Sequence, residues 1–116
     1  TQKVTFPVSP VVPAAKAEAK IKQDDNGNAR VHLSVRHLAP PERLHPPQKF
    51  YVVWVQRPDG RIVNLGKMNL NDELEGEFLG VTPWDNFRIL ITGESTPDSS
   101  APTGTAVLAT ESFSVK

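Results

Sequence analysis

Apolar and polar residues alternate along much of the chain, and this alternation predicts β-strands. In residues 15–22, alanine and isoleucine alternate with lysine and glutamate, and in residues 30–36, valine and leucine alternate with arginine, histidine and serine. Since successive side chains of a strand point to opposite faces of its sheet, each segment has one buried and one solvated face. The Asn26-Gly27 pair between the two segments predicts an antiparallel hairpin closed by a type I′ turn.

A third predicted strand differs because it is apolar at both parities. Residues 50–55 read Phe-Tyr-Val-Val-Trp-Val, and a run this rich in aromatic and β-branched side chains predicts a central strand that is covered on both faces. We expect Trp54 to be its anchor in the core. Pro58 and Gly60 then predict a turn, so the strand predicted over residues 62–68 forms a second hairpin with it.

The remaining segments bring the count to about eight strands. They are a short strand at residues 3–6, one at 73–78 with Glu73, Glu75 and Glu77 on its outer face, one at 87–92, and one at 105–115 that bends or breaks near 109–111. No helical stripe interrupts this series, and short strands separated by turn signals are typical of an all-β fold. We therefore predict a single domain over residues 1–116, an antiparallel β-sandwich with an immunoglobulin-like arrangement.

Two long connections are rich in residues that do not extend a strand. Residues 38–48 contain four prolines, and residues 94–104 consist mainly of serine, threonine, proline and aspartate. Recognition residues lie most often on loops held by a rigid scaffold, so we expect contacts with a partner to come from these connections and from the turns. The expected contact residues are Asp24, Asp25, Asn26, Arg43, His45, Trp84, Glu94 and Asp98.

Composition excludes several functions for these 116 residues. Lysine plus arginine and aspartate plus glutamate both number 13, so the chain lacks the basic excess that binding a nucleic-acid backbone requires. Without cysteine it forms no disulfide and no thiolate zinc site, and it contains no run of about twenty apolar residues that would span a membrane. Residues 1–58 carry 9 basic and 4 acidic groups and residues 59–116 the reverse. We expect these charges to meet mostly as cross-strand pairs.

Candidate catalytic and metal-binding motifs fail on closer inspection. Asp24, Asn26 and Asn28 have the first ligand spacings of a calcium loop, but position twelve is Val35 rather than an acid, so a hairpin turn explains them better. The three glutamates at residues 73–77 point to one solvated face, which does not suit a glycosidase pair. No nucleophile elbow, phosphate loop or zinc-protease motif occurs. We therefore expect no catalytic residue, no cofactor and no metal site, and a protein that is not an enzyme.

Several of these positions resemble the extracytoplasmic C-terminal domain of the anti-sigma-K factor family, in order and in spacing. The residues that carry the resemblance are Tyr51 and Trp54, Gly60, Leu65 and Gly66, Thr92 and Glu94, and Pro102, Thr103 and Gly104. The alternating strand pair that ends at Pro41 also fits, so the resemblance spans roughly residues 15–108. The chain departs from the family's pattern at residues 95–99, where the family usually has a proline and a Gly-Gly-Ser turn.

This resemblance implies an exported module that follows a membrane helix and a sigma-binding segment. Neither part lies in this sequence, and the start at Thr1 rather than at methionine leads us to expect an upstream segment such as a signal peptide or a membrane anchor. The expected function is contact with a protein or a cell-envelope component outside the cytoplasm, with membrane attachment only through the missing segment. The alternative is a stand-alone secreted carbohydrate-binding or adhesion domain that uses Trp84 or Tyr51.

Overall fold

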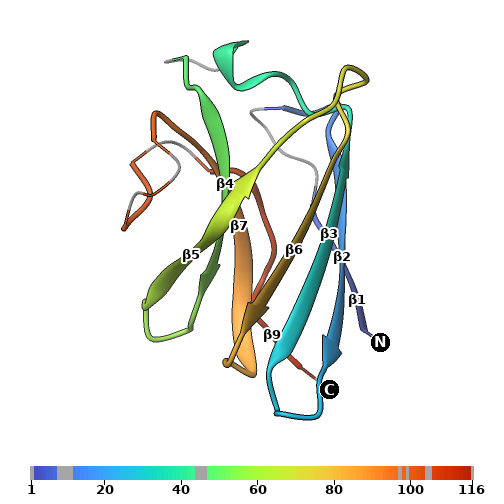
Figure 1. Cartoon of the computed structure of the whole chain (residues 1–116), viewed down its shortest axis with the longest axis vertical. Helices are drawn as coiled ribbons and strands as arrows, with labels where there is room; N and C mark the ends of the chain where they lie inside the picture. Colours follow the sequence, from blue (N-terminus) through green and yellow to red (C-terminus); the bar gives the residue numbers. More distant parts are fainter. Residues whose placement is uncertain are drawn as a thin grey trace.

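The computed structural model describes residues 2–7, 12–43, 47–96, 98, 100–103 and 106–115. Within these residues nine β-strands form two antiparallel sheets (Figure 1). The four-stranded sheet contains, in spatial order, β1 (Gln2–Thr5), β2 (Lys16–Gln23), β3 (Ala29–Arg36) and β6 (Gly76–Thr82). The five-stranded sheet contains β5 (Ile62–Met68), β4 (Phe50–Gln56), β7 (Asn86–Glu94) and β8 (Ala106–Ala109), with β9 (Phe113–Ser114) also paired to β7. No helix of the described residues is long and apolar enough to cross a membrane; the helical structure found in them is a 3₁₀ turn at Pro41–Arg43.

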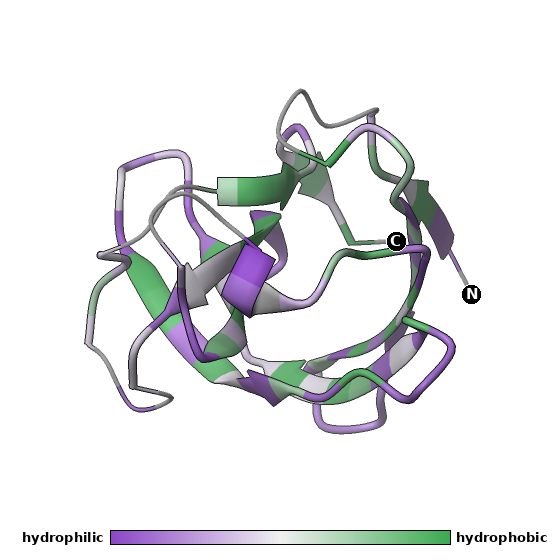
Figure 2. Cartoon of the chain, turned by 90° about the horizontal axis from the view of Figure 1, so that it is seen from above, coloured by the Kyte–Doolittle hydropathy of each residue, from purple (hydrophilic) through white to green (hydrophobic). Residues whose placement is uncertain are grey.

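The two sheets pack face to face, which confirms the predicted antiparallel β-sandwich. The chain passes from the β2–β3 hairpin to the β4–β5 hairpin of the other sheet, returns to place β6 beside β3, and crosses again to place β7 beside β4. Figure 2 shows the two layers from above, with hydrophobic and hydrophilic residues alternating along the strands. The inward-facing side chains bury one continuous core. Its members include Ile21, Leu33, Tyr51, Phe87 and Ile91, each at most 1% exposed.

The last strand breaks where the sequence predicts. β8 ends at Ala109 and β9 begins at Phe113, and both pair with β7. At the break the hydroxyl of Thr110 accepts a hydrogen bond from the backbone N–H of Ile89 (3.0 Å), and the N–H of Thr110 donates to the carbonyl of Ile89 (2.9 Å). Both residues are buried, so the threonine supplies the hydrogen bonds that the interrupted ladder lacks.

The β2–β3 hairpin is present as predicted, but its turn is not of type I′. Between the two strands only Gly27 has a positive φ, of 82°, whereas a type I′ turn needs a positive φ at Asn26 as well. The N–H of Gly27 donates to the carbonyl of Asp24 (3.1 Å), and the N–H of Asp24 donates to the carbonyl of Asn28 (2.8 Å). A longer loop with one left-handed glycine therefore replaces the expected two-residue turn, because the side chain of Asp24 stabilises it.

β6 begins later than the sequence predicts. The expected strand starts at Glu73, but the structure has a turn there, in which Leu74 adopts a positive φ of 61°. The side-chain oxygen of Asn71 accepts hydrogen bonds from the N–H groups of Glu73 (2.9 Å) and Glu75 (3.0 Å). This local bonding by an asparagine stabilises a turn against the strand, so only Glu77 of the three glutamates lies in β6.

Trp54 is fully buried, but outside the core between the sheets. It lies on the opposite face of the five-stranded sheet, where it packs with Val52 and Leu90 in a second, smaller cluster. Tyr51 on the same strand faces the main core instead. The strand is covered on both faces as predicted. The prediction that Trp54 is the core anchor of this strand is confirmed, but in the smaller cluster rather than between the sheets, because the even-numbered residues of β4 point away from the other sheet.

Candidate functional site

The predicted contact residues lie at two opposite ends of the sandwich. The turns that hold Asp24, Asp25, Asn26 and Trp84 lie at the end shown at the bottom of Figure 1, and the connections that hold Arg43, Glu94 and Asp98 lie at the other. His45 lies outside the described residues. No single surface therefore includes all the described contact residues. We call the end with the two long connections the long-loop end; its described residues are 37–43, 47–49, 95–96, 98 and 100–103.

At the long-loop end, Glu94 is completely buried and its carboxylate accepts several hydrogen bonds. The backbone N–H of Thr103 donates to Oε1 (3.1 Å) and Oε2 (3.2 Å), and the Thr103 hydroxyl donates to Oε1. The hydroxyl of Thr92 donates to Oε2 and itself accepts a hydrogen bond from the indole N–H of Trp54 (2.8 Å). These four residues form a connected set of donors and acceptors, which we call the Glu94 network.

The register of β4 and β7 brings these side chains together. Thr92 and Glu94 are two residues apart on β7 and therefore point to the same outer face of the five-stranded sheet, where Trp54 on neighbouring β4 also lies. A buried carboxylate without partners is very unfavourable, whereas each hydrogen bond to a charged group contributes about 1.5 to 3 kcal/mol. The network thus holds Thr103, near the end of the connection that follows β7, against the sheet.

Glu94 begins one of the predicted contact loops, but its own side chain is 0% exposed, so contacts from this loop would come from its other residues. Its role is to position the loop that holds Asp98, which is exposed. Thr92 and Thr103 belong to this site, although the composition of the loop alone does not identify them. The available signal is the spacing Thr-x-Glu followed by Pro-Thr-Gly, the same residues that carry the family resemblance.

The other long connection is held by Tyr51. Its side chain is 1% exposed, and its hydroxyl donates a hydrogen bond to the carbonyl of Ala39. Burial of the phenol, and secondarily the negative charge of Glu42, raises the pKa of Tyr51 to about 12, so the group stays a neutral donor at physiological pH. Leu38 is buried beside it, and its N–H donates to the carbonyl of Leu74 (3.2 Å). Both long connections are therefore attached to the sandwich by buried side chains.

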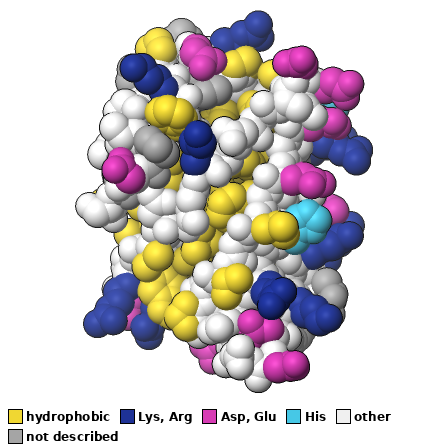
Figure 3. All heavy atoms as spheres, in the orientation of Figure 1, with side chains coloured by type: hydrophobic (Ala, Val, Ile, Leu, Met, Phe, Trp, Pro, Cys, Tyr) yellow, Lys and Arg dark blue, Asp and Glu magenta, His cyan; other side chains and the backbone are white. Residues whose placement is uncertain are grey.

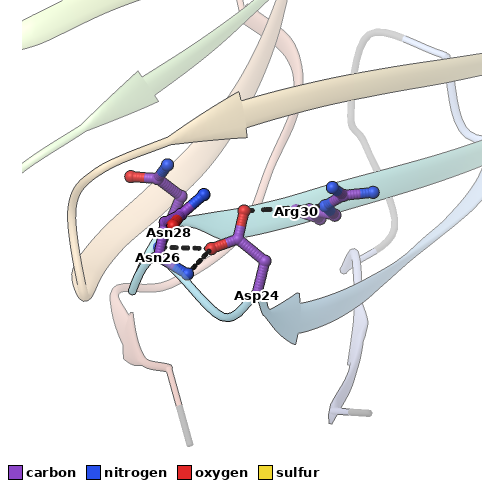
Figure 4. Close-up of polar contacts among 4 residues, drawn as sticks. All are labelled: Asp24, Asn26, Asn28 and Arg30. Carbon is purple, nitrogen blue, oxygen red and sulfur yellow. Dashed lines mark hydrogen bonds and ion pairs between the residues drawn. The ribbon is translucent and has the colours of Figure 1, made fainter.

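At the opposite end, the carboxylate of Asp24 bonds within its own loop (Figure 4). Oδ1 accepts hydrogen bonds from the N–H groups of Asn26 and Asn28, both at 2.9 Å, and Oδ2 lies 3.6 Å from Nε of Arg30. The bond from Asn28, together with smaller effects of Asn26 and Arg30, outweighs partial desolvation and lowers the pKa of Asp24. These contacts account for the spacing of the aspartate and asparagines. Asp25 and the side chain of Asn26 remain exposed.

Trp84 is half-buried beside a hollow of about 420 Å³ between the β4–β5 and β6–β7 turns. The hollow is lined by Arg57, Pro58, Asp59, Pro83, Trp84, Asp85 and Asn86. The guanidinium carbon of Arg57 lies 5.6 Å from the centre of a Trp84 ring, and its Nη2 lies 3.7 Å from a carboxylate oxygen of Asp59. An aromatic ring bordered by polar groups offers stacking and hydrogen bonds to a small polar ligand. Tyr51, the other aromatic residue expected in such a role, is buried and cannot contribute.

Neither metal ligands nor similarity to known proteins indicates a function for the chain. Among the described residues, no three histidine, aspartate or glutamate side chains gather closely enough to bind a metal ion. No protein-family model and no curated protein sequence matches the chain. A proposal about function must therefore rest on the chain's own geometry, and the long-loop end and the Trp84 hollow are the candidate sites that include predicted contact residues.

Proposed function

We propose that this chain is a non-enzymatic recognition module that works outside the cytoplasm and contacts a protein or cell-envelope component through its long-loop end. The module is similar to the outer domain of a membrane anti-sigma regulator, in which it would follow a membrane helix and a sigma-binding segment. One observation carries the proposal: buried side chains attach both long connections, Tyr51 for the first and the Glu94 network for the second.

Attachment of this kind supports recognition, because a loop that is ordered before binding loses less conformational entropy when it binds. Hydrophobic packing of similar volume often stabilises a fold as well as a buried charged group does, or better. The buried carboxylate of Glu94 is therefore best explained if recognition of the partner requires a fixed conformation where Thr103 bonds to it. Arg43 and Asp98, both exposed at this end, are the charged groups that the two connections then present to a partner.

Replacement of residues 95–101 by a glycine-serine segment of equal length tests the role of the loop, because it retains both Glu94 and Thr103. The original chain and the variant are each immobilised and used to capture components of the cell envelope. We expect the variant not to capture the proteins or polymers that the original chain captures. The matched control is Asp25→Ser with Asn26→Ser at the opposite end, which should retain them. Capture by the loop variant equal to that of the original chain would mean that the long-loop end is not the contact surface.

The likeness to a regulator is tested separately, with an antibody against the domain and fractionation of native cells. The regulator hypothesis predicts an antigen in the membrane fraction that is clearly larger than the 12.7 kDa of this chain. A free antigen close to that mass, in the periplasm or the medium, would leave a stand-alone binding module and would contradict the regulator hypothesis.

The Trp84 hollow favours a second candidate function, carbohydrate binding. The chain has two tryptophans, and Trp54 is 0% exposed while Trp84 borders the hollow. A bound oligosaccharide should therefore change the fluorescence of Trp84 alone. Titration with a panel of envelope oligosaccharides, repeated with Trp84→Phe, checks this. A fluorescence change that persists in Trp84→Phe, or no change with any of them, would count against a sugar site in the hollow.

A further inference from the structure

The outward-facing side chains of the four-stranded sheet form a surface that is separate from both sites described above. We call it the basic face; it consists of Lys3, Lys16, Glu18, Lys20, Lys22, Arg30, His32, Arg36, Glu77, Leu79 and Val81. Lys20, His32 and Leu79 form one row across the strands, and Lys22, Arg30 and Val81 form the next. Part of the face is visible along the right-hand flank of Figure 3, where charged side chains gather over β2 and β3.

Each carboxylate on or beside this face lies close to one base. The four pairs are Lys3 with Glu18 (3.1 Å), Arg30 with Asp24 (3.6 Å), Arg36 with Glu75 (3.9 Å) and His32 with Glu77 (4.0 Å). Three lysines of β2, Lys16, Lys20 and Lys22, have no carboxylate within 4.0 Å in the described part of the chain. The opposite charges of the two halves of the sequence thus meet across strands only in part, and a row of lysines is left uncompensated.

These three lysines also lie opposite other bases. Lys20 lies opposite Lys3, Lys22 lies opposite Arg30, and Lys16 lies opposite Arg36. Like charges directly opposite each other destabilise a sheet, so the arrangement does not contribute to folding. An anionic partner bound along β2 would relieve this repulsion.

Leu79 and Val81 add an apolar strip to the same face. They are 76% and 52% exposed and lie on β6, two strands and hence about 10 Å from Lys20 and Lys22. The same face carries a hollow of about 490 Å³ toward the end of β2 that holds Lys16. It is lined by Lys16, Ala17, Glu18, Lys20, His32, Ser34, Arg36 and Glu77. A partner on this face therefore meets uncompensated positive charge on one side and exposed aliphatic groups on the other.

We infer that the basic face binds an extended acidic segment of a protein partner that also carries aliphatic side chains. Alternate residues of an extended segment are about 7 Å apart, which is also the spacing from Lys20 to Lys22, so carboxylates at alternate positions meet successive lysines. A nucleic acid fits less well because the chain has no net positive charge. A lipid surface fits less well because two aliphatic side chains give little to insert. The inference goes beyond the proposed function and does not rest on it, since this surface belongs to the strands of the four-stranded sheet and not to the two long connections.

The test measures the binding of a labelled peptide by fluorescence anisotropy. The peptide has about twelve residues and carries glutamate and leucine at different positions of an extended strand. Two double variants with the same change of charge are compared: Lys20→Gln with Lys22→Gln, and Arg61→Gln with Lys67→Gln, whose side chains are exposed elsewhere. At low salt we expect the first to weaken binding roughly tenfold and the second less than about twofold. Leu79→Ser with Val81→Ser should weaken binding of this peptide but not of one with serine in place of leucine.

Equal losses in the two charge variants would mean that only net charge matters, and would overturn the inference. Binding of phosphatidylglycerol vesicles that depends on Lys20 and Lys22, without binding of the peptide, would overturn it in favour of a lipid surface. Thermal unfolding of every variant is measured alongside. All of these substitutions are at exposed positions, so we expect each variant to fold.

Discussion

The backbone N–H of Thr103 lies within hydrogen-bond distance of both carboxylate oxygens of Glu94, at 3.1 and 3.2 Å, although the two residues are nine positions apart. This contact attaches Thr103, which lies beyond the end of β7, to the five-stranded sheet. The same carboxylate accepts a bond from Thr92, whose hydroxyl accepts the indole N–H of Trp54. The position of Thr103 is therefore coupled to the small cluster on the outer face of the five-stranded sheet.

Removal of this carboxylate should destabilise the fold. Glu94→Ala leaves the N–H of Thr103 and the hydroxyl of Thr92 without their buried acceptor, so we expect the free energy of unfolding to fall by about 3 kcal/mol. Thr103→Val removes the hydroxyl bond alone and should lower it by about 1 kcal/mol. Denaturation in urea measures both. The exposed Ser100→Ala in the same loop is the control, and a loss for Glu94→Ala no larger than the control's would contradict the network.

Tyr51→Phe should lower the free energy of unfolding by about 1 kcal/mol at neutral pH, because it removes the hydrogen bond to Ala39. The substitution should also change how the free energy of unfolding depends on pH in the alkaline range. The pKa of Tyr51 is about 12 in the folded chain, against about 10 when unfolded. Between these pH values the unfolded chain loses the proton while the folded chain keeps it, so stability falls as pH rises. The phenylalanine variant should lack this component.

The Tyr51 pKa is directly measurable, since the chain has one tyrosine. Ultraviolet absorbance of the phenolate, followed as pH rises in the folded protein, reports this group alone. We expect the titration to lie clearly above that of the urea-unfolded chain. Coincident folded and unfolded titrations would show that the phenol is not held in the buried hydrogen bond.

Asp24 should contribute to stability at neutral pH and lose this contribution in acid. Its pKa is lowered in the folded chain from an ordinary value of 3.8, so as pH falls through this range the unfolded chain takes up the proton first and stability decreases. Asp24→Ala should lower the urea midpoint at pH 7, and Asp24→Asn, which keeps an acceptor for the N–H groups of Asn26 and Asn28, should lower it less and weaken the acid dependence. Asp25→Asn serves as the neighbouring control and should change neither.

Reversal of charge at Lys20 should stabilise the protein. Lys20 lies opposite Lys3, so Lys20→Glu replaces a repulsion by an attraction, worth about 0.5 kcal/mol in the free energy of unfolding at low salt. The gain should disappear at high salt, because exposed charges are screened there. Thermal unfolding at two salt concentrations measures it. A loss of stability at low salt would contradict the uncompensated positive charge assigned to this face.

Strand positions followed closely from the sequence, because the burial of one face imposes a period of two. Residues 62–68 form β5 with the predicted bounds, and the break of the last strand lies where it was expected. The turns were less predictable: the side chains of Asp24 and Asn71 bond to nearby backbone N–H groups. These bonds stabilise loops that the alternation of apolar and polar residues does not predict.

The candidate site was harder to predict than the fold for two physical reasons. A glutamate in a polar segment is normally solvated, and nothing in the local pattern shows that Thr103 returns to donate to Glu94. Trp54 lies in a strand that is apolar on both faces, so parity alone cannot decide which face meets the other sheet. For Glu94 the spacing of Thr92, Glu94 and Thr103, rather than the local pattern, carried the information.

The most direct test of the long-loop end as the contact surface is photo-crosslinking in native cells. A photoreactive residue is placed at Asp98 in one variant and at Asp25, at the opposite end of the sandwich, in another; both positions are exposed. We predict a discrete crosslinked product from position 98 and none from position 25. A product from position 25 alone, or no product from position 98, would contradict recognition through the long-loop end.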